Sequence, residues 1–321
     1  MSRVNLQLVT PQILNPMALH IIGGTVVDLI LPRVRRIPNW PEHTEFTAAN
    51  LTLLKEAPIT TLGGNGANAA YVAGRCGAKV VLHTRIARDA MGGLARGWLT
   101  DAGCRVVAKG RVAATAVNVT AANRKMGRAT FCYAGEPVEL PGALKSCSHL
   151  LVCGWPHPEP EVLANQLGLA QRGGARTAVD IGPMLGAVPS LAAMAPVWEV
   201  LDVLLANEHE VRRLTRARDL TAAVRRLRGR FGGDVVVKRG ADGVSWWPAG
   251  ESMPTEFAPV RVDAVNTVGA GDSFNGAWLA AWQAGADFAQ ALRYANRTAA
   301  SVVKSARGVL GVRPNPPQRL S

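Results

Sequence analysis

The chain has 321 residues, of which 48% are hydrophobic and 18% are charged, as is usual for a folded globular protein. No apolar run is long enough to cross a bilayer, and the first twenty residues lack the basic start and continuous apolar stretch of a signal peptide. The five cysteines are scattered and form no C-x-x-C pair, which argues against a disulfide framework or a zinc site. These features predict a cytoplasmic protein with reduced thiols and no membrane partner.

The net charge of +13 comes mostly from arginines that are spread along the chain. The densest group falls on helix-like segments that also carry acidic residues, and no aromatic residues are interleaved with it. Such a pattern favours a solvated face over a surface for nucleic acid. The arginines of this group are Arg212, Arg213, Arg216, Arg218, Arg225, Arg226, Arg228 and Arg230.

Short β-branched runs alternate with longer alanine-rich runs of helical period along most of the chain. We predict strands at 19–31, 79–86, 149–155, 176–182, 203–207 and 234–240. Helices are predicted at 66–77, 89–103, 160–174, 208–215, 221–233, 272–285 and 287–307, with Asp89 as an N-terminal cap. Strands that are apolar on both faces need helices on each side, so the pattern predicts an α/β fold with a central, mostly parallel sheet flanked by helices.

Two segments, at about 30–62 and 111–140, have alternating patterns with no helix between the runs. We interpret them as antiparallel strands of a small lid that projects from the edge of the main sheet and keeps water from the chemistry. The edge strands of such a lid are a natural place for a homodimer to form. We expect residues 1–18 to be an N-terminal extension, 19–313 a single domain and 314–321 a tail, with the Pro/Gly-rich stretch 308–317 on the surface.

The most informative stretch is Gly269-Ala270-Gly271, which Asp272 follows at the start of a strongly helical run. Small residues let backbone N–H groups approach an anion closely, and a helix N-terminus adds positive potential. Asp272 is by itself a competent helix cap. It is also a residue that can take a proton from a hydroxyl group attacking a phosphate held by those N–H groups.

The sequence N-T-V-G-A-G-D, followed by a small- and apolar-rich helix, resembles the C-terminal signature of the ribokinase-like (PfkB) family of carbohydrate kinases. The run G-G-N-G-A-N-A-A at 63–70 is similar to the N-terminal G-G-x-x-x-N-x-A signature of that family. The motifs follow in family order over about 20–313. The resemblance implies a ribokinase-like fold and an ATP-dependent transfer of the γ-phosphate to a hydroxyl of a small sugar or sugar-like substrate.

The resemblance also implies roles for individual residues. Asp272 would be the base, with Gly269, Ala270 and Gly271 as the anion hole. The residues that would hold the hydroxyls of the substrate are Asp28, Gly63, Gly64 and Asn68. The residues that would bind ATP are Asn207, Lys238, Gly240, Gly243, Asn296 and Gly308.

Glu210 belongs to an N-x-x-E element that begins at Asn207, and the resemblance implies that it organises the water shell of Mg²⁺. Hard carboxylate oxygens suit a magnesium ion that keeps most of its waters. ATP and Mg²⁺ are therefore the expected cofactors. Neither a Walker A sequence nor G-x-G-x-x-G occurs, so a P-loop or a dinucleotide-binding fold is not expected.

Several residues depart from the family pattern. Asn266 stands where many relatives carry an Asp that helps to bind a potassium-type ion, which weakens the implication of a K⁺ site. Gly154 replaces a substrate-contacting Glu, Asn65 replaces a common Lys, and Lys238 replaces a Thr. The segment 180–183 (D-I-G-P) lacks the Asn and Arg of D-x-N-x-R. These departures argue against an orthodox ribokinase or phosphofructokinase and leave an unusual sugar, a sugar acid or a nucleoside open.

Two alternative functions are left open. A nucleoside kinase of the same family would need a larger apolar pocket, which Trp40, Phe46, Phe131 and Tyr133 in the lid could supply. A ligand sensor or nucleic-acid-associated regulator on the same fold would use the positive charge without catalysis. The intact Asp272 and anion hole speak against this second alternative.

Overall fold

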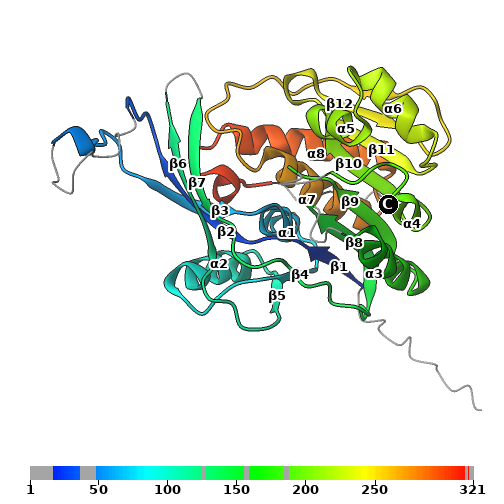
Figure 1. Cartoon of the computed structure of the whole chain (residues 1–321), viewed down its shortest axis with the longest axis horizontal. Coiled ribbons are helices and arrows are strands. Elements are labelled where there is room, and N and C mark those ends of the chain that lie inside the picture. The colour runs from blue at the N-terminus through cyan, green and yellow to red at the C-terminus, as the bar shows by residue number, and fades with distance from the viewer. Residues whose placement is uncertain are drawn as a thin grey trace, which may run out of the picture.

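The structure is a computed structural model, and it describes residues 17–36, 48–123, 127–154, 159–183, 188–314 and 317. In these ranges nine strands form the main sheet and four more form a second sheet. From one edge to the other the main sheet contains β13 (Thr255–Phe257), β12 (Val244–Trp247), β11 (Asp234–Lys238), β10 (Val203–Asn207), β9 (Arg176–Asp180), β8 (Cys147–Cys153), β1 (Ala18–Ile22), β4 (Val80–Thr84) and β5 (Arg105–Ala108). The strands from β11 to β5 run parallel, and β12 and β13 are antiparallel. This arrangement confirms the predicted fold class (Figure 1).

Helices cover both faces of the main sheet and bury two separate apolar cores. Successive residues of a strand point to opposite faces, so within β8 Leu151 joins one core while Leu150 and Val152 join the other. The first core is closed by α1 (Asn65–Arg75), α2 (Ala90–Asp101), α7 (Ala270–Gln283) and α8 (Phe288–Val303). The second is closed by α3 (Pro160–Arg172), α4 (Ala195–Trp198), α5 (Glu208–Thr215) and α6 (Leu220–Arg228). Among the described helices, none has the length and apolarity that crossing a bilayer requires.

The lid is a second sheet of four strands, in the order β3 (Ile59–Gly63), β2 (Val26–Leu31), β6 (Ala116–Ala122) and β7 (Arg128–Tyr133). It stands at the left of the main body in Figure 1. The expectation of purely antiparallel pairing is wrong, because β2 and β6 are parallel while the outer pairs are antiparallel. Between β3 and β6 the chain passes through α1, β4, α2 and β5, so it enters the lid a second time in the same direction. Trp40 and Phe46 lie outside the described residues, and homodimerisation through the lid stays a prediction.

The predicted strand at 19–31 is two strands in two different sheets. It breaks after Ile22, so β1 lies inside the main sheet, between β8 and β4, and β2 lies in the lid. Gly23 lies at the break, where a Cβ atom would come within 2.7 Å of the Cα of Gly66 in α1. The prediction of one strand failed because the residues before and after the break are equally apolar. The break depends instead on the close approach of Gly23 to Gly66, which lies 43 positions later in the chain.

The stretch 308–317 is not a surface tail throughout. Gly308–Gly311 forms the short 3₁₀ helix η3, and Val309 and Val312 are buried in the first core. Two other short 3₁₀ helices are η1 (Ala48–Asn50) and η2 (Gly240–Asp242). Asp89 caps α2 as predicted, with its side chain accepting a hydrogen bond from Gly92 N.

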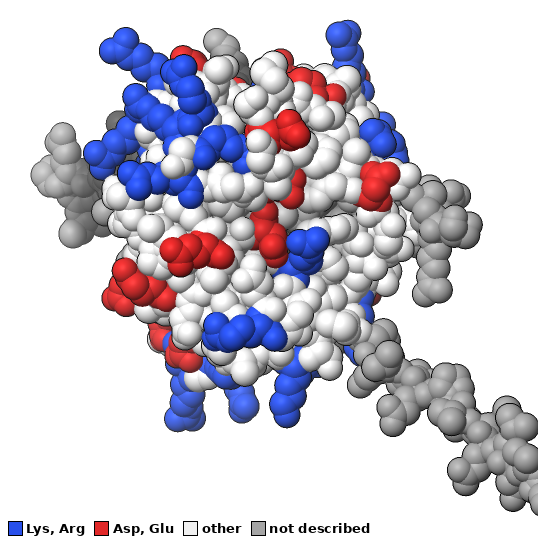
Figure 2. All heavy atoms as spheres, turned by 90° about the vertical axis from the view of Figure 1, so that its right-hand side faces the viewer, with Lys and Arg blue, Asp and Glu red and all other residues white. Residues whose placement is uncertain are grey.

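The arginine group lies on α5, on α6, in the turn between them and in the turn after α6, on the face that Figure 2 turns toward the viewer. Basic side chains gather at the upper left of this face, while acidic side chains and further basic ones are spread over the rest of it (Figure 2). Part of the group has structural partners, since Arg226 donates to the carbonyl oxygens of Thr215 and Arg216, and Arg228 donates to those of Trp247 and Pro248. These bonds close the α5–α6 hairpin and fasten it to the sheet.

Candidate active site

Three polar side chains stand at the carboxyl ends of adjacent parallel strands. Asp180 ends β9, Asn207 ends β10 and Lys238 ends β11, and the strand register places Asn207 directly opposite Lys238. In open α/β sheets this edge is where ligands bind, because the loops that follow the strands leave a crevice there. The parallel order of the sheet therefore collects residues 180, 207 and 238 into one region.

The Gly-Ala-Gly motif forms the start of α7. Gly269 is the N-cap residue, with a φ of 76° that favours glycine, and the helix begins at Ala270. No side chain caps this end, so Asp272 is not a capping residue in the structure. Ala270 N donates to the carbonyl oxygen of Thr267 at 3.4 Å at the start of this turn. The N–H groups of the first turn and the helix dipole give this end a positive potential suited to an anion.

Helix α1 fixes the position of Asp272. The amide Nδ2 of Asn68 donates a hydrogen bond of 2.9 Å to Oδ2 of Asp272. The two helices approach closely because Gly276 of α7 lies against α1, where an added Cβ atom would collide with the carbonyl oxygen of Ala69. Asn68 is buried, and its Oδ1 has no hydrogen-bond partner within the described part of the chain.

The pKa of Asp272 is raised to about 6. Burial is the main cause, and the negative charges of Asp180 and Asp28 add to it. The hydrogen bond from Asn68 and the positive charge of Lys238 act in the opposite direction. A carboxylate with this pKa is ionised at neutral pH and is close to the range in which a general base works well.

Asp28 lies in the lid and is held by another lid residue. Its Oδ1 accepts a hydrogen bond of 2.9 Å from Nδ2 of Asn118 in β6, and burial raises the pKa of Asp28 while this bond lowers it. Gly63 in β3 leaves room for the carboxylate, since a Cβ atom there would collide with Asp28. Gly64, with a φ of 82°, makes the turn into α1.

Asn207 and Glu210 form a capping box at the start of α5. The Asn207 side chain accepts from Glu210 N at 2.8 Å, and Oε2 of Glu210 accepts from Asn207 N at 2.8 Å. The spacing of the N-x-x-E element therefore has a local structural explanation. Burial and the charge of Asp180 raise the pKa of Glu210, against the lowering effect of Lys238.

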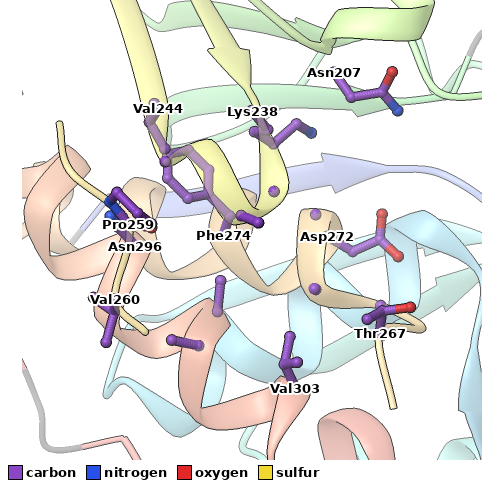
Figure 3. Close-up of a pocket in the computed structure, with 18 of the residues that line it drawn as sticks. Asn207, Lys238, Val244, Pro259, Val260, Thr267, Asp272, Phe274, Asn296 and Val303 are labelled. Carbon is purple, nitrogen blue, oxygen red and sulfur yellow. The ribbon is translucent and has the colours of Figure 1, made fainter. Parts of the chain in front are cut away.

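A cavity of about 750 Å³ runs from this polar edge toward α8. This volume lies within the range of sites for small ligands and cofactors. Its polar end includes the carboxyl edge of the sheet and the start of α7 (Figure 3). Its apolar end is lined by Val244, Pro259, Val260, Phe274, Ala299, Ala300 and Val303. Asn296 also lines it, with Nδ2 donating to the carbonyl oxygen of Ala258 at 2.8 Å.

A buried polar network lies at the polar end of the cavity. Nζ of Lys238 is 3.0 Å from Oδ1 of Asp180 and 3.2 Å from Oδ1 of Asn275. Nδ2 of Asn275 donates in turn to Oδ2 of Asp180 at 2.7 Å. Burial opposes the charge on Lys238, but the carboxylates of Asp180 and Glu210 outweigh it, and the net effect raises the pKa of this lysine.

The structure brings most of the sequence-predicted residues together around Asp272. The predicted ATP residues that line the cavity are Asn207, Lys238, Gly240, Gly243 and Asn296. Gly308 does not line it, and lies near Asn266 and Thr61 instead. Asp28, Gly63, Gly64 and Asn68 lie outside the cavity lining, and Asn68 is joined to it through Asp272.

Sequence reasoning missed Asn118 and Asn275 and assigned no role to Asp180. The sequence around Asn118 does not predict a role for it, because an Asn is common in a run of alternating residues. Its role depends on the pairing of β6 with β2, which places Asn118 beside Asp28. Asn275 lies in an otherwise small and apolar helix segment, and a buried Asn in such a segment is a signal of a polar partner. Asn65, which also lines the cavity, was noted as a departure from the family pattern.

Comparison with known proteins identifies the family of this chain and several structural relatives. A family model described as the pfkB family of carbohydrate kinases matches residues 22–312. An ATP-dependent ribose-1-phosphate kinase from Halopiger xanaduensis is 33% identical over 143 residues, which are 43% of this chain and 43% of that protein. The match to this curated relative therefore spans less than half of its length.

Solved structures share the fold at low identity. Ribokinase from Arabidopsis thaliana, complexed with ribose and ATP, is 21% identical with a TM-score of 0.75, covering 93% of this chain and 96% of that one. Ribokinase from Thermotoga maritima is 20% identical with a TM-score of 0.74 over 92% and 96% of the two chains. An E. coli protein in complex with ATP and Mg²⁺ is 20% identical with a TM-score of 0.70 over 92% and 95%. Because the family model covers almost all of the described fold, the chain belongs to the pfkB family of carbohydrate kinases, which are phosphotransferases.

Proposed function

We propose that this protein transfers the γ-phosphate of ATP to a hydroxyl group of a small sugar or sugar-like substrate, with Asp272 as the base. One observation carries the proposal. Asp272 lines the cavity of about 750 Å³, and its pKa is raised to about 6, with the negative charge of Asp28 in the lid among the causes. In the proposal, Asp272 meets the nucleotide in this cavity and the acceptor hydroxyl on the side of Asp28.

In the proposed reaction the acceptor oxygen attacks the γ-phosphorus and forms a new O–P bond, while its proton passes to Asp272. The bond between the γ-phosphorus and the bridging oxygen breaks, and its electron pair leaves with ADP. The N–H groups at the start of α7, from Gly269 to Gly271, bind the negative charge on the transferring group. Apolar side chains such as Val244 and Phe274 line the end of the cavity that suits adenine.

The residues at the polar end of the cavity fit Mg²⁺. In the described part of the chain no group of three or more His, Cys, Asp or Glu side chains could hold a metal. Magnesium needs only one or two carboxylates and otherwise keeps water or phosphate oxygens. Glu210 and Asp180 line the cavity and would hold the ion or its waters. When bound, Mg²⁺ would neutralise charge on the phosphates.

The acceptor is proposed to be a sugar-like polyhydroxyl compound. Asp28 accepts hydrogen bonds, and Asn68 and Asn118 each keep a buried Oδ1 without a partner among the described residues. Such a set of acceptors complements the O–H donors of a sugar. The relatives point the same way, since one is complexed with ribose and another is a ribose-1-phosphate kinase. A reaction that consumes ATP, in a chain with scattered cysteines, suits the cytoplasm.

The test is the release of ADP from Mg-ATP across a panel of sugars, sugar acids, sugar phosphates and nucleosides. We expect turnover with one class of compound and a loss of about 10²- to 10⁴-fold in kcat for Asp272→Asn. The variant should keep the melting temperature of the wild type. Near-normal turnover by Asp272→Asn would refute the base. Silence of the wild type across the panel, together with salt-sensitive DNA binding, would favour the regulator instead.

A further inference from the structure

Lys238 has a position and a charge that the proposed mechanism has not yet used. It ends β11 at the carboxyl edge of the sheet, and its side chain is 13% exposed, at the cavity. The ammonium group of a lysine has three donors. Asp180 and Asn275 take two of them, and among the described residues none is recorded for the third.

The ammonium group also lies against the first turn of α7. A Cβ atom built on Gly271 would be 3.6 Å from Nζ of Lys238. Gly271 belongs to the motif whose N–H groups begin the helix, so the charge of Lys238 and the helix N-terminus face the same part of the cavity. In Figure 3 the amino group of Lys238 points to the side where Asn207 and Asp272 lie.

The charges at this end of the cavity need a cation. Three carboxylates, those of Asp180, Glu210 and Asp272, line it together with Lys238, while Arg261 lines the other end beside Pro259 and Val260. A triphosphate that enters a partly buried site with three carboxylates is repelled unless positive charge compensates them. Magnesium supplies part of that charge, and Lys238 is the ammonium group that the chain itself supplies there.

We propose that Lys238 binds the γ-phosphate of ATP directly and remains bound to it during transfer, while Asp180 and Asn275 hold its ammonium group in place. This inference rests on the proposed function, and it makes Lys238 a catalytic residue. Lys238 stands where the family pattern has a Thr, so this chain has an ammonium group in place of a hydroxyl. A charge-assisted hydrogen bond to phosphate is stronger than one from a neutral hydroxyl, and it strengthens where negative charge develops.

A purely structural role for Lys238 gives different results. If the lysine only neutralises buried Asp180, the double variant Lys238→Met/Asp180→Asn removes both charges. It should then restore both the thermal stability and the preference for ATP over ADP that Lys238→Met alone loses. If Lys238 binds the γ-phosphate, the double variant should regain thermal stability but not the preference for ATP. Binding of ATP can be compared with binding of ADP, which lacks the γ-phosphate, in the absence of any acceptor.

The experiment is calorimetric titration of Mg-ATP and Mg-ADP into the wild type, Lys238→Met, Lys238→Thr and the double variant, with melting temperatures for each. We expect the ATP affinity of every Lys238 variant to fall on the order of 10- to 100-fold, with the ADP affinity changed less than threefold. An unchanged ratio of ATP to ADP affinity in Lys238→Thr would overturn the proposal, as would its recovery in the double variant. A failed sugar panel would not affect this ratio, so the two proposals can fail separately.

Discussion

Asn68 donates a hydrogen bond of 2.9 Å to Asp272, and the two residues come from helices α1 and α7. The bond fixes the orientation of the proposed base and stabilises its charged form. It also connects the two family signatures of the chain, since Asn68 belongs to the first and Asp272 to the second. The two motifs therefore act as one site.

The first prediction concerns the pH dependence of the reaction. Asn68→Ala removes a donor that favours the carboxylate, so the pKa of Asp272 should rise from about 6. Since the base must be ionised, the acid limb of kcat/KM should move to higher pH, and the loss of activity should be greater at pH 6 than at pH 8. The measurement is the pH–rate profile, with Asn165→Ala, an exposed change in α3, as a control. An acid limb that stays in place would show that the bond does not govern the base.

The second prediction concerns substrate affinity. Asp28→Ala should raise the KM for the sugar about 10- to 100-fold, because a charged acceptor of its hydroxyls is lost. Asn118→Ala should raise it less, since it leaves Asp28 in place without its donor. Steady-state kinetics with the substrate that the panel identifies measure both effects, and Asp101→Ala, an exposed change in α2, is the matched control. A KM unchanged in both lid variants would remove the lid from substrate binding.

The third prediction concerns the contact between α1 and α7. Gly276→Ala should lower the free energy of unfolding by about 1–3 kcal/mol, because the new methyl group meets the carbonyl oxygen of Ala69. Gly97→Ala is a matched change, since Gly97 is an exposed residue inside α2 with nothing within 4 Å of an added Cβ atom. It should stabilise the protein by up to about 1 kcal/mol. Urea denaturation measures both, and equal effects would contradict the packing argument.

The fourth prediction concerns stability in mild acid. His20 and His83 are buried and share a 2.9 Å hydrogen bond between Nδ1 and Nε2, and burial lowers the pKa of His83 to about 4. Burial lowers the pKa of His149 to about 4 as well. Between about pH 4 and pH 6.5, His83 and His149 bind protons in the unfolded chain but stay neutral in the folded one, so their contribution to stability should fall as pH decreases through that window.

The melting temperature measured from pH 7 to pH 5 tests this slope. His83→Gln keeps a polar group near the position of Nε2 and should make the slope shallower. His209→Gln, at an exposed position of α5, is the control and should leave it unchanged. If His83→Gln has the same slope as the wild type, His83 does not determine the acid sensitivity.

Short sequence patterns predicted most of the strands and helices and the position of the motifs. They could do so because each motif lies where a strand or turn leads directly into a helix. The cap at Asp89 and the turn before Asp272 needed only neighbours in sequence. The predictions that failed depended on partners far along the chain. The break at Gly23 depends on its contact with α1. The parallel pairing of β2 with β6 depends on the path of the chain through the main sheet between β3 and β6. Asn118 and Asn275 became site residues only when strand pairing and helix packing brought carboxylates to them.

The separation of 204 residues between Asn68 and Asp272 also has a consequence for biosynthesis. A ribosome delivers the first signature early, and α1 can pack on β1 and β4 long before α7 exists. The base arrives with the last sixth of the chain, so a nascent or truncated protein that ends before residue 270 lacks the base, most of the anion hole and the residues of α7 and α8 that line the cavity. Closing so large a loop is slow. Activity therefore reports completion of the fold, and its recovery during refolding should lag behind formation of the central strands.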